Sequence, residues 1–276
     1  MPAALPDNIA ETVTIALRED IGAGDRTTSL ISASTKTTAT VVAREPAILC
    51  GTAWFDEVFR QLDNSVQISW SAHDGENVNK EQTICKLSGT AQTLLTGERT
   101  ALNFLQSLSG TATTTREYVE MLKGCKTQIL DTRKTLPGLR SAQKYAVLCG
   151  GGKNHRMGLN DAILIKENHI LAAGSITAAI TAAKKQGVPV EIEVENLVEL
   201  EEALAAGTDS VLLDNFDLEG LRQAVAINNS RAILEASGGV DKEKLRAIAE
   251  TGVDFISIGA LTKHVRAIDF SMRFIS

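Results

Sequence analysis

The sequence predicts an α/β protein with an incomplete, roughly six-stranded α/β barrel and an N-terminal α+β sandwich domain. Between residues 127 and 258, short apolar stretches alternate with helical patterns, and the helix-to-strand turns at 206–209 and 250–254 are similar. Apolar strands that alternate with helices are typical of a parallel sheet buried on both faces. Before residue 109, strand and helix patterns instead favour an antiparallel sheet with helices on one face.

The composition is that of an ordinary globular chain: 276 residues, 43% hydrophobic and 22% charged. A net charge of -6 argues against non-specific nucleic-acid binding, so an anionic ligand requires a local group of cations. Residues 1–7 lack the basic and apolar regions of a signal peptide, and no apolar run reaches the roughly 18 residues of a membrane span. Four widely spaced cysteines lack zinc-site spacing, so we expect reduced thiols in a cytoplasmic protein: Cys50, Cys85, Cys125 and Cys149.

The first domain is expected to span residues 1–109 and to be joined by a C-terminal strand at 266–276. Amphipathic spacing predicts its helices at 7–20, 53–62 and 91–107. Alternation predicts its strands at 38–44, 66–71 and 83–88. The last residues, 269–275, alternate in the same way, so we expect them to return to this sheet.

The barrel is expected at residues 110–265. Its predicted helices are 111–123, 139–148, 175–186, 197–206, 217–228 and 241–251. Its predicted strands are 127–131, 161–166, 190–194, 209–213, 232–235 and 254–258. Six strands are fewer than the usual eight, which is why we expect the barrel to be incomplete.

Charged and glycine-rich tips follow these strands, and the carboxyl ends of barrel strands converge on one site. The stretch Asp131–Gly138 places two cations side by side at its strand end, and Gly150–Arg156 adds more. Together the tips predict a cationic pocket for a small polyanion: Arg133, Lys134, His155, Arg156 and Lys166.

Glu195 and Asp214 follow neighbouring strands, and two carboxylates beside phosphates are the usual way to hold Mg²⁺. Ser237–Gly239 and Ile258–Ala260 are turns in the last two positions, where barrels bind phosphate on backbone N–H groups. The combination predicts a phosphorylated sugar, an anionic partner and a divalent metal.

Each tip also has a plainer structural interpretation. Glycines after strands often only turn the chain, Asp214 could cap the next helix, and Lys166 could pair with Glu167. Arg99, on the predicted helix 91–107, suits a helix-surface salt bridge. Three other functions stay open: a class I aldolase with Lys166 as Schiff base, an enzyme acting on another anionic base, and a phosphosugar sensor without turnover.

The chain resembles the quinolinate phosphoribosyltransferase family, also called carboxylating nicotinate-nucleotide pyrophosphorylase, over essentially its whole length. The resemblance is carried by nine blocks in family order: Glu19–Thr28, Gly97–Asn103, Asp131–Gly138, Gly151–Arg156, Ile165–His169, Glu193–Asn196, Leu213–Asn215, Glu235–Gly239 and Ser257–Thr262. It implies a homodimer, in which Arg99 reaches into the partner's pocket, and leaves a higher oligomer open. The implied reaction joins quinolinate to phosphoribosyl pyrophosphate with Mg²⁺, giving nicotinate mononucleotide, pyrophosphate and CO₂ in NAD biosynthesis.

The resemblance also implies roles for the tips. Arg133, Arg156 and the partner's Arg99 would clamp the two carboxylates of quinolinate, flanked by His155 and Lys166. The implied catalytic residues are Lys134, Lys166, Glu195 and Asp214, the last two also holding the metal directly or through water. The remaining implied substrate contacts are Thr132, Ser237, Gly238, Gly239, Ile258, Gly259 and Ala260.

Overall fold

The structure, a computed structural model, describes residues 4–275. Residues 1–3, part of the stretch expected to lack a signal peptide, and residue 276, at the end of the expected C-terminal strand, lie outside the described residues. The chain divides into two compact units, each discontinuous in sequence. The first comprises the chain up to Arg116, Thr135–Gly151 and the residues from Leu261 on; the second comprises Glu117–Lys134 and Gly152–Ala260.

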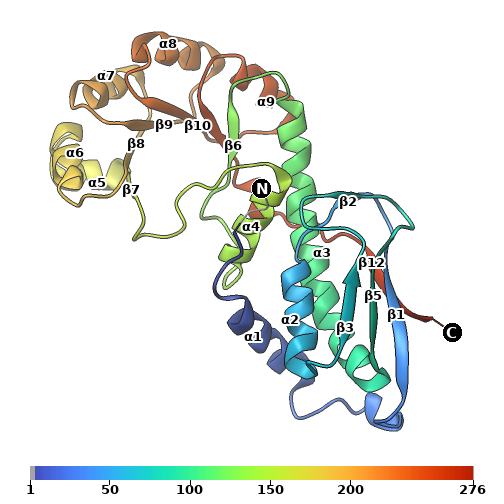
Figure 1. The fold of residues 1–276 in the computed structure, drawn as a ribbon. Helices are drawn as coiled ribbons and strands as arrows, with labels where there is room; N and C mark the ends of the chain where they lie inside the picture. Colours follow the sequence, from blue (N-terminus) through green and yellow to red (C-terminus); the bar gives the residue numbers. More distant parts are fainter. Residues whose placement is uncertain (1–3, 276) are drawn as a thin grey trace. The chain divides into compact units, whose positions relative to one another are not determined.

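The first unit contains a four-stranded antiparallel sheet in the order β12-β1-β5-β3. The strands are β1 (Lys36–Ala43), β3 (Gln67–Trp70), β5 (Thr83–Thr90) and β12 (Phe270–Ile275), and a two-residue pair joins β2 (Ala47–Ile48) to β4 (Asn77–Val78). Its helices include α1 (Ile9–Ile21), the 3-10 turn η1 (Thr28–Leu30), α2 (Thr52–Leu62), α3 (Ala91–Met121) and α4 (Arg140–Gly150). The N-terminal α+β sandwich is therefore confirmed (Figure 1).

The core of this unit forms because β1 alternates: Ala39, Val41 and Ala43 are buried on one face. Aromatic side chains of α2 fill the space against them, with Phe55 stacked edge-on to Trp70 at a ring distance of 5.2 Å. Helix α4 belongs to the same core, since Tyr145 is buried against Trp54 at 5.5 Å.

Helix α3 corrects one expectation. The sequence predicts two helices, 91–107 and 111–123, but residues 91–121 form one continuous helix. Gly110 lies between the two predicted helices and is needed for close packing: a Cβ there would lie 2.1 Å from the carbonyl oxygen of Arg266.

The second unit is a parallel sheet of six strands in the order β6-β11-β10-β9-β8-β7, and neither edge strand pairs with the other. The strands are β6 (Gln128–Leu130), β7 (Ile163–Ile165), β8 (Val190–Val194), β9 (Ser210–Asp214), β10 (Ile233–Ser237) and β11 (Phe255–Ser257). The intervening helices are α5 (Glu167–Ala173), α6 (Ile176–Lys184), α7 (Leu197–Ala205), α8 (Leu218–Asn228) and α9 (Lys242–Ala249) (Figure 1). The six expected strands and the incomplete barrel are confirmed.

Four of these helices begin at side-chain caps, which fixes where each strand end turns into the next helix. In each, a side-chain oxygen of the capping residue accepts the backbone N–H of the residue three positions later. The capping residues are Ser175, Asn196, Asp217 and Asp241. Asp217, and not Asp214, caps α8, so the carboxylate of Asp214 is not used as a helix cap. Among residues 4–275, no helix combines the length with the apolar composition that a bilayer crossing requires.

Candidate functional site

The stretch after β6 is tied to the segment that follows α4 by a buried carboxylate. Asp131 has no exposed surface; its Oδ1 accepts the backbone N–H of His155 at 2.9 Å, and its Oδ2 accepts Nδ2 of Asn154 at 2.5 Å. Lys153 also forms a parallel bridge with Leu130. These bonds bring together two of the cationic segments that the sequence predicted would meet.

Two guanidinium groups lie next to each other at this point. The buried Nε of Arg133 has no hydrogen-bond partner among the described residues, while Nη1 of Arg156 donates to the carbonyl of Ala162 at 3.2 Å. Burial, and then the charge of Arg133, lower the pKa of Arg156 against the opposing effect of Asp161 and Glu191. Adjacent, partly buried cations that repel each other are arranged to receive an anion.

His155 lies beside them but uses both ring nitrogens within the protein. Its Nδ1 accepts the backbone N–H of Arg156 at 2.7 Å, so the ring proton belongs on Nε2. That nitrogen lies 2.7 Å from Oε2 of Glu191 and 3.5 Å from Oε2 of Glu235. The ring therefore holds the backbone that carries Arg156, and the expected direct contact of His155 with substrate stays a prediction.

Glu235 is an acid buried inside the sheet, with 2% of its surface exposed. Burial, and then the charge of Glu191, raise its pKa to about 8, while His155 and Ser257 act in the opposite direction. Glu191 is held in turn by the hydroxyl of Ser210, which donates to its Oε1 at 2.9 Å. Glu235 is thus protonated at neutral pH, so Glu191 and Glu235 together carry less than two negative charges.

Nearer the strand ends, Lys166 forms an ion pair with Glu193 of β8. Burial and then Glu193 raise the pKa of Asp214, while Lys166 and Lys134 lower it. Nδ2 of Asn215 donates to Asp214 at 2.7 Å. The side chains expected at the tips of β6, β7 and β9 therefore lie close enough to interact, and the partner of Lys166 is Glu193.

Glu195 follows β8 and is exposed. Its backbone N–H donates to Glu199 at 2.8 Å, and it lines a cavity of about 220 Å³ together with Glu193 and residues of α5. Because side chains alternate along a strand, Glu191 and Glu193 point to the same face of β8, while Glu195 lies just beyond the end of the strand.

Two glycines at the tips of β10 and β11 are required by their surroundings. Gly238 has φ +97°, and a Cβ there would lie 2.1 Å from Oδ1 of Asn215; a Cβ on Gly259 would lie 2.9 Å from Cδ of Lys134 and 3.5 Å from Oγ1 of Thr132. Gly239, at φ +56°, has no atom within 4 Å of an added Cβ.

The remaining predicted contacts surround these glycines. The carbonyl of Ser237 accepts the N–H of Asn215 at 3.0 Å, and the buried Ile258 donates its N–H to Leu130 at 3.0 Å. Ala260 begins the short helix α10 (Ala260–Lys263). The turns after β10 and β11 therefore present small residues beside Lys134, as a phosphate site requires.

Arg99 differs from the other predicted residues. It lies on α3 in the first unit with an exposed side chain. The sequence reasoning gave no role to Asp131, Glu191, Glu193 or Glu235. The alternation of glutamates with Ile192 and Val194 was a signal for β8, since acids at every second position of a buried strand require partners.

Cations, carboxylates and glycine turns at the carboxyl ends of a parallel sheet are the arrangement of an α/β-barrel enzyme for anionic, phosphorylated substrates. Comparison with known proteins identifies the family. The domain described as "Quinolinate phosphoribosyl transferase, N-terminal domain" matches residues 25–109, and the corresponding C-terminal domain matches residues 111–273. The chain therefore belongs to the quinolinate phosphoribosyltransferase family.

Individual relatives agree over nearly the full length. A probable carboxylating nicotinate-nucleotide pyrophosphorylase of Bacillus subtilis is 44% identical, covering 92% of this chain and 89% of its own. The Mycobacterium leprae enzyme of that name is 40% identical over 96% and 97%. A solved nicotinate-nucleotide pyrophosphorylase structure from Francisella tularensis is 50% identical, with TM-score 0.96 over 99% and 98%. The chain is a phosphoribosyltransferase of NAD biosynthesis, from a family that acts on quinolinate.

Proposed function

We propose that the paired guanidinium groups of Arg133 and Arg156 bind the two carboxylates of quinolinate in this chain. The observation that carries the proposal is the buried Nε of Arg133, which has no hydrogen-bond partner among the described residues and lies beside a second cation. A dicarboxylate supplies the missing acceptors, and a guanidinium binds a carboxylate through two parallel hydrogen bonds. His155 would act on the substrate by positioning Arg156.

The phosphoribosyl pyrophosphate would lie toward β9, β10 and β11. Ser237, Gly238, Gly239 and the turn at 258–260 would seat the 5-phosphate on backbone N–H groups. Thr132 and the side chain of Lys134, packed beside Gly259, would face the pyrophosphate together with Lys166. The open space over Gly239 leaves room for a phosphate to approach the backbone.

The carboxylates at the sheet edge fit Mg²⁺. Burial and then the charge of Glu193 raise the pKa of Asp214. A cation beside the two carboxylates would offset this effect and favour the charged form of Asp214. Asp214 and Glu195 would hold the ion directly or through water, since Mg²⁺ takes one or two protein carboxylates and otherwise phosphate oxygens and water. When bound, Mg²⁺ neutralises charge that builds up on the departing pyrophosphate.

The chemistry needs little proton transfer from the protein. The pyridine nitrogen of quinolinate already has a lone pair, so its attack on the anomeric carbon requires no general base. Glu195 and Asp214 would offset the positive charge that develops at that carbon, and Lys134 and Lys166 would stabilise the leaving pyrophosphate. The alkylated ring is then an electron sink: the adjacent carboxylate leaves as CO₂, and the ring carbon that held it takes up a proton from solvent. Orientation of two substrates is worth about 7–11 kcal/mol in favourable cases.

Release of labelled CO₂ from carboxyl-labelled quinolinate in the presence of phosphoribosyl pyrophosphate and Mg²⁺ tests this function. We expect CO₂ and nicotinate mononucleotide in equal amounts, and no product with nicotinate in place of quinolinate. Ligand binding without CO₂ release would contradict the proposal in favour of a sensor. Borohydride trapping of a keto substrate on Lys166 would instead indicate an aldolase.

We further propose that the protein acts as a cytoplasmic homodimer in which Arg99 completes the partner's quinolinate site. Supporting this, Arg99 is exposed on α3, and the four cysteines carry free thiols, as expected in a reducing compartment. Arg99→Ala and Arg133→Ala should each lose most of their activity at a quinolinate concentration near the wild-type KM, and mixing them should restore one working site per mixed dimer. Mixed dimers that form without regaining activity would contradict the shared site.

A further inference from the structure

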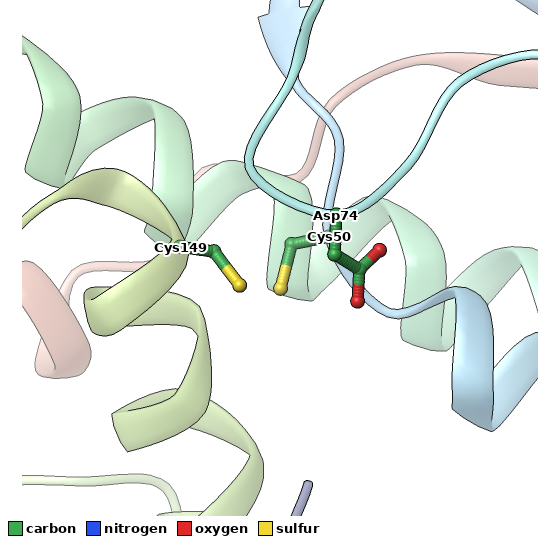
Figure 2. Close-up of side chains that lie close together, drawn as sticks. All are labelled: Cys50, Asp74 and Cys149. Atoms are coloured by element: carbon green, nitrogen blue, oxygen red, sulfur yellow. The ribbon is translucent and has the colours of Figure 1, made fainter. Parts of the chain in front are cut away.

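Three potential metal ligands from distant parts of the chain meet inside the first unit. The Sγ atoms of Cys50 and Cys149 and a carboxylate oxygen of Asp74 all lie within 4.8 Å of one another. Figure 2 shows the two sulfur atoms turned toward each other, with Asp74 beside Cys50. Cys50 precedes α2, Asp74 lies in the turn between β3 and β4, and Cys149 is in the last turn of α4.

The spacing suits a four-coordinate ion. With metal–sulfur and metal–oxygen bonds of about 2.3 and 2.0 Å, a tetrahedral site has edges of about 3.8 Å between two sulfurs and about 3.5 Å between sulfur and oxygen. The observed donors fall within reach of those edges, so side-chain adjustment suffices to bring them to an ion. The fourth position would be filled by water.

The carboxylate is already oriented as metal ligands usually are. One oxygen of Asp74 accepts the backbone N–H of Thr52 at 3.2 Å, and the other accepts the hydroxyl of Tyr145 at 2.9 Å. In metalloproteins, hydrogen bonds from neighbouring protein groups fix the orientation of the residues that bind the metal. A carboxylate that accepts such bonds retains lone pairs for the ion. The backbone at Cys50 is equally fixed, because its N–H donates to Ser109 at 2.9 Å and its carbonyl accepts from the same hydroxyl at 3.1 Å.

Access also fits, since Cys50 is fully buried whereas Asp74 and Cys149 are partly exposed. An ion can therefore enter from the side of Asp74 and Cys149. Two thiolates select a soft or borderline cation such as Zn²⁺ over Mg²⁺.

A divalent cation would offset the charge of all three donors at once, after both thiols have given up their protons.

We propose that Cys50, Asp74 and Cys149 form a binding site for one thiophilic divalent cation, with Zn²⁺ as the fitting ion. Both thiols lose their protons to solvent on binding, and two metal–sulfur bonds form without any change of oxidation state. The ion fastens the end of α4 to the start of α2. Along the chain, α4 connects Asp131–Gly138 with Gly151–Arg156, so the site stabilises the helix between the two cationic segments.

Cobalt titration of the full-length protein, reduced and stripped with a chelator, tests the proposal. We expect one equivalent of Co²⁺ to produce thiolate-to-cobalt charge-transfer absorption, and Zn²⁺ to displace it. Cys149→Ser should abolish this absorption. Cys125→Ser is the matched control, because that cysteine lies in the second unit, and it should titrate as the wild type does.

A second variant guards against misfolding at a buried position. Asp74→Asn retains an oxygen that can accept one of the two hydrogen bonds but removes the charge, and its affinity for Co²⁺ should fall by roughly tenfold or more. Circular dichroism verifies that each variant is folded. Absence of the charge-transfer band in the wild type, an unchanged band in folded Cys149→Ser, or loss of two thiols to a disulfide in the reduced, metal-free protein would each overturn the proposal.

Discussion

The interior of the six-stranded sheet and its carboxyl edge differ in how their charged side chains are partnered. In the interior, His155, Glu191 and Glu235 form contacts with one another, and one acid keeps its proton. At the edge, the charge of Arg133 acts on the neighbouring Arg156, and a buried nitrogen of Arg133 has no hydrogen-bond partner among residues 4–275.

This difference separates support from binding. A buried network of direct side-chain contacts fixes one geometry, while the unpartnered nitrogen of Arg133 costs stability unless a ligand completes it. Oε1 of Glu235 also has no hydrogen-bond partner among residues 4–275, but the raised pKa keeps this carboxyl uncharged, which lessens the cost. The interior therefore positions the backbone at Arg156, and the edge is where substrate affinity resides. Substitutions in the interior and at the edge should therefore differ in which property they change, as well as in how much they change it.

The largest effect is expected for Arg133→Ala. Losing charge-assisted hydrogen bonds of about 1.5–3 kcal/mol should raise the KM for quinolinate by roughly 10- to 150-fold. Steady-state kinetics with quinolinate varied measure this. Arg222→Ala, which removes an exposed arginine paired with Glu219, is the control and should leave KM unchanged. Equal behaviour of the two variants would remove Arg133 from the edge site.

Gly238→Ala should rank next. Its Cβ would collide with Asn215 at a positive φ, so we expect unfolding free energy to fall by about 1–3 kcal/mol and the KM for phosphoribosyl pyrophosphate to rise. Gly239→Ala is the matched control: it has a positive φ but open space, and should cost about 1–2 kcal/mol with a smaller change in KM. Denaturant melts and kinetics separate the two, and identical melts would mean that the collision is relieved.

Glu235→Gln should change pH dependence more than activity at pH 7. The pKa of Glu235 is raised from 4.5 to about 8, so its contribution to stability is complete below pH 4.5 and is lost as pH rises to about 8. The glutamine variant should lack that slope, about 1.4 kcal/mol per pH unit for one proton. It should also lack a decline in kcat/KM near pH 8. Parallel stability–pH curves for both proteins would contradict a protonated Glu235.

The smallest effect is expected for Glu191→Gln. Its amide oxygen can still accept from His155, and the hydroxyl of Ser210 can instead accept from its amide nitrogen, so activity at pH 7 should change by less than about tenfold. Removing the charge of Glu191 should lower the pKa of Glu235, which moves the alkaline decline to lower pH. A pH–rate profile measures the displacement, and a shift to higher pH would reverse the assigned direction of coupling.

The sequence predicted the barrel because its signals are local. Apolar strands, capping residues and turn glycines lie within a few positions of one another, and parallel strands bring their carboxyl ends to one edge. The proximity of Lys134 and Lys166 to Asp214 follows from that rule. The proximity of Arg133 to Arg156 also depends on Asp131, which holds the segment after α4 by hydrogen bonds.

Other features escaped because their causes are not local. The predicted break between helices 91–107 and 111–123 does not occur, and Gly110 inside α3 packs against a backbone carbonyl that is distant in sequence. Glu193, and not Glu167, pairs with Lys166, since a strand places alternate residues on the site face. Cys50 and Cys149 are far apart along the chain, so no spacing pattern could indicate that they meet.

Strand β12 has a consequence for how the protein is made. It pairs with β1 but is synthesised after all six strands of the parallel sheet. Throughout that interval, the edge of β1 from Thr38 to Ala43 exposes unpaired backbone groups, which is a template for association with other chains. During synthesis, the edge of β1 therefore stays unpaired until β12 has been made. Truncation within β12 should favour aggregation over a shortened enzyme.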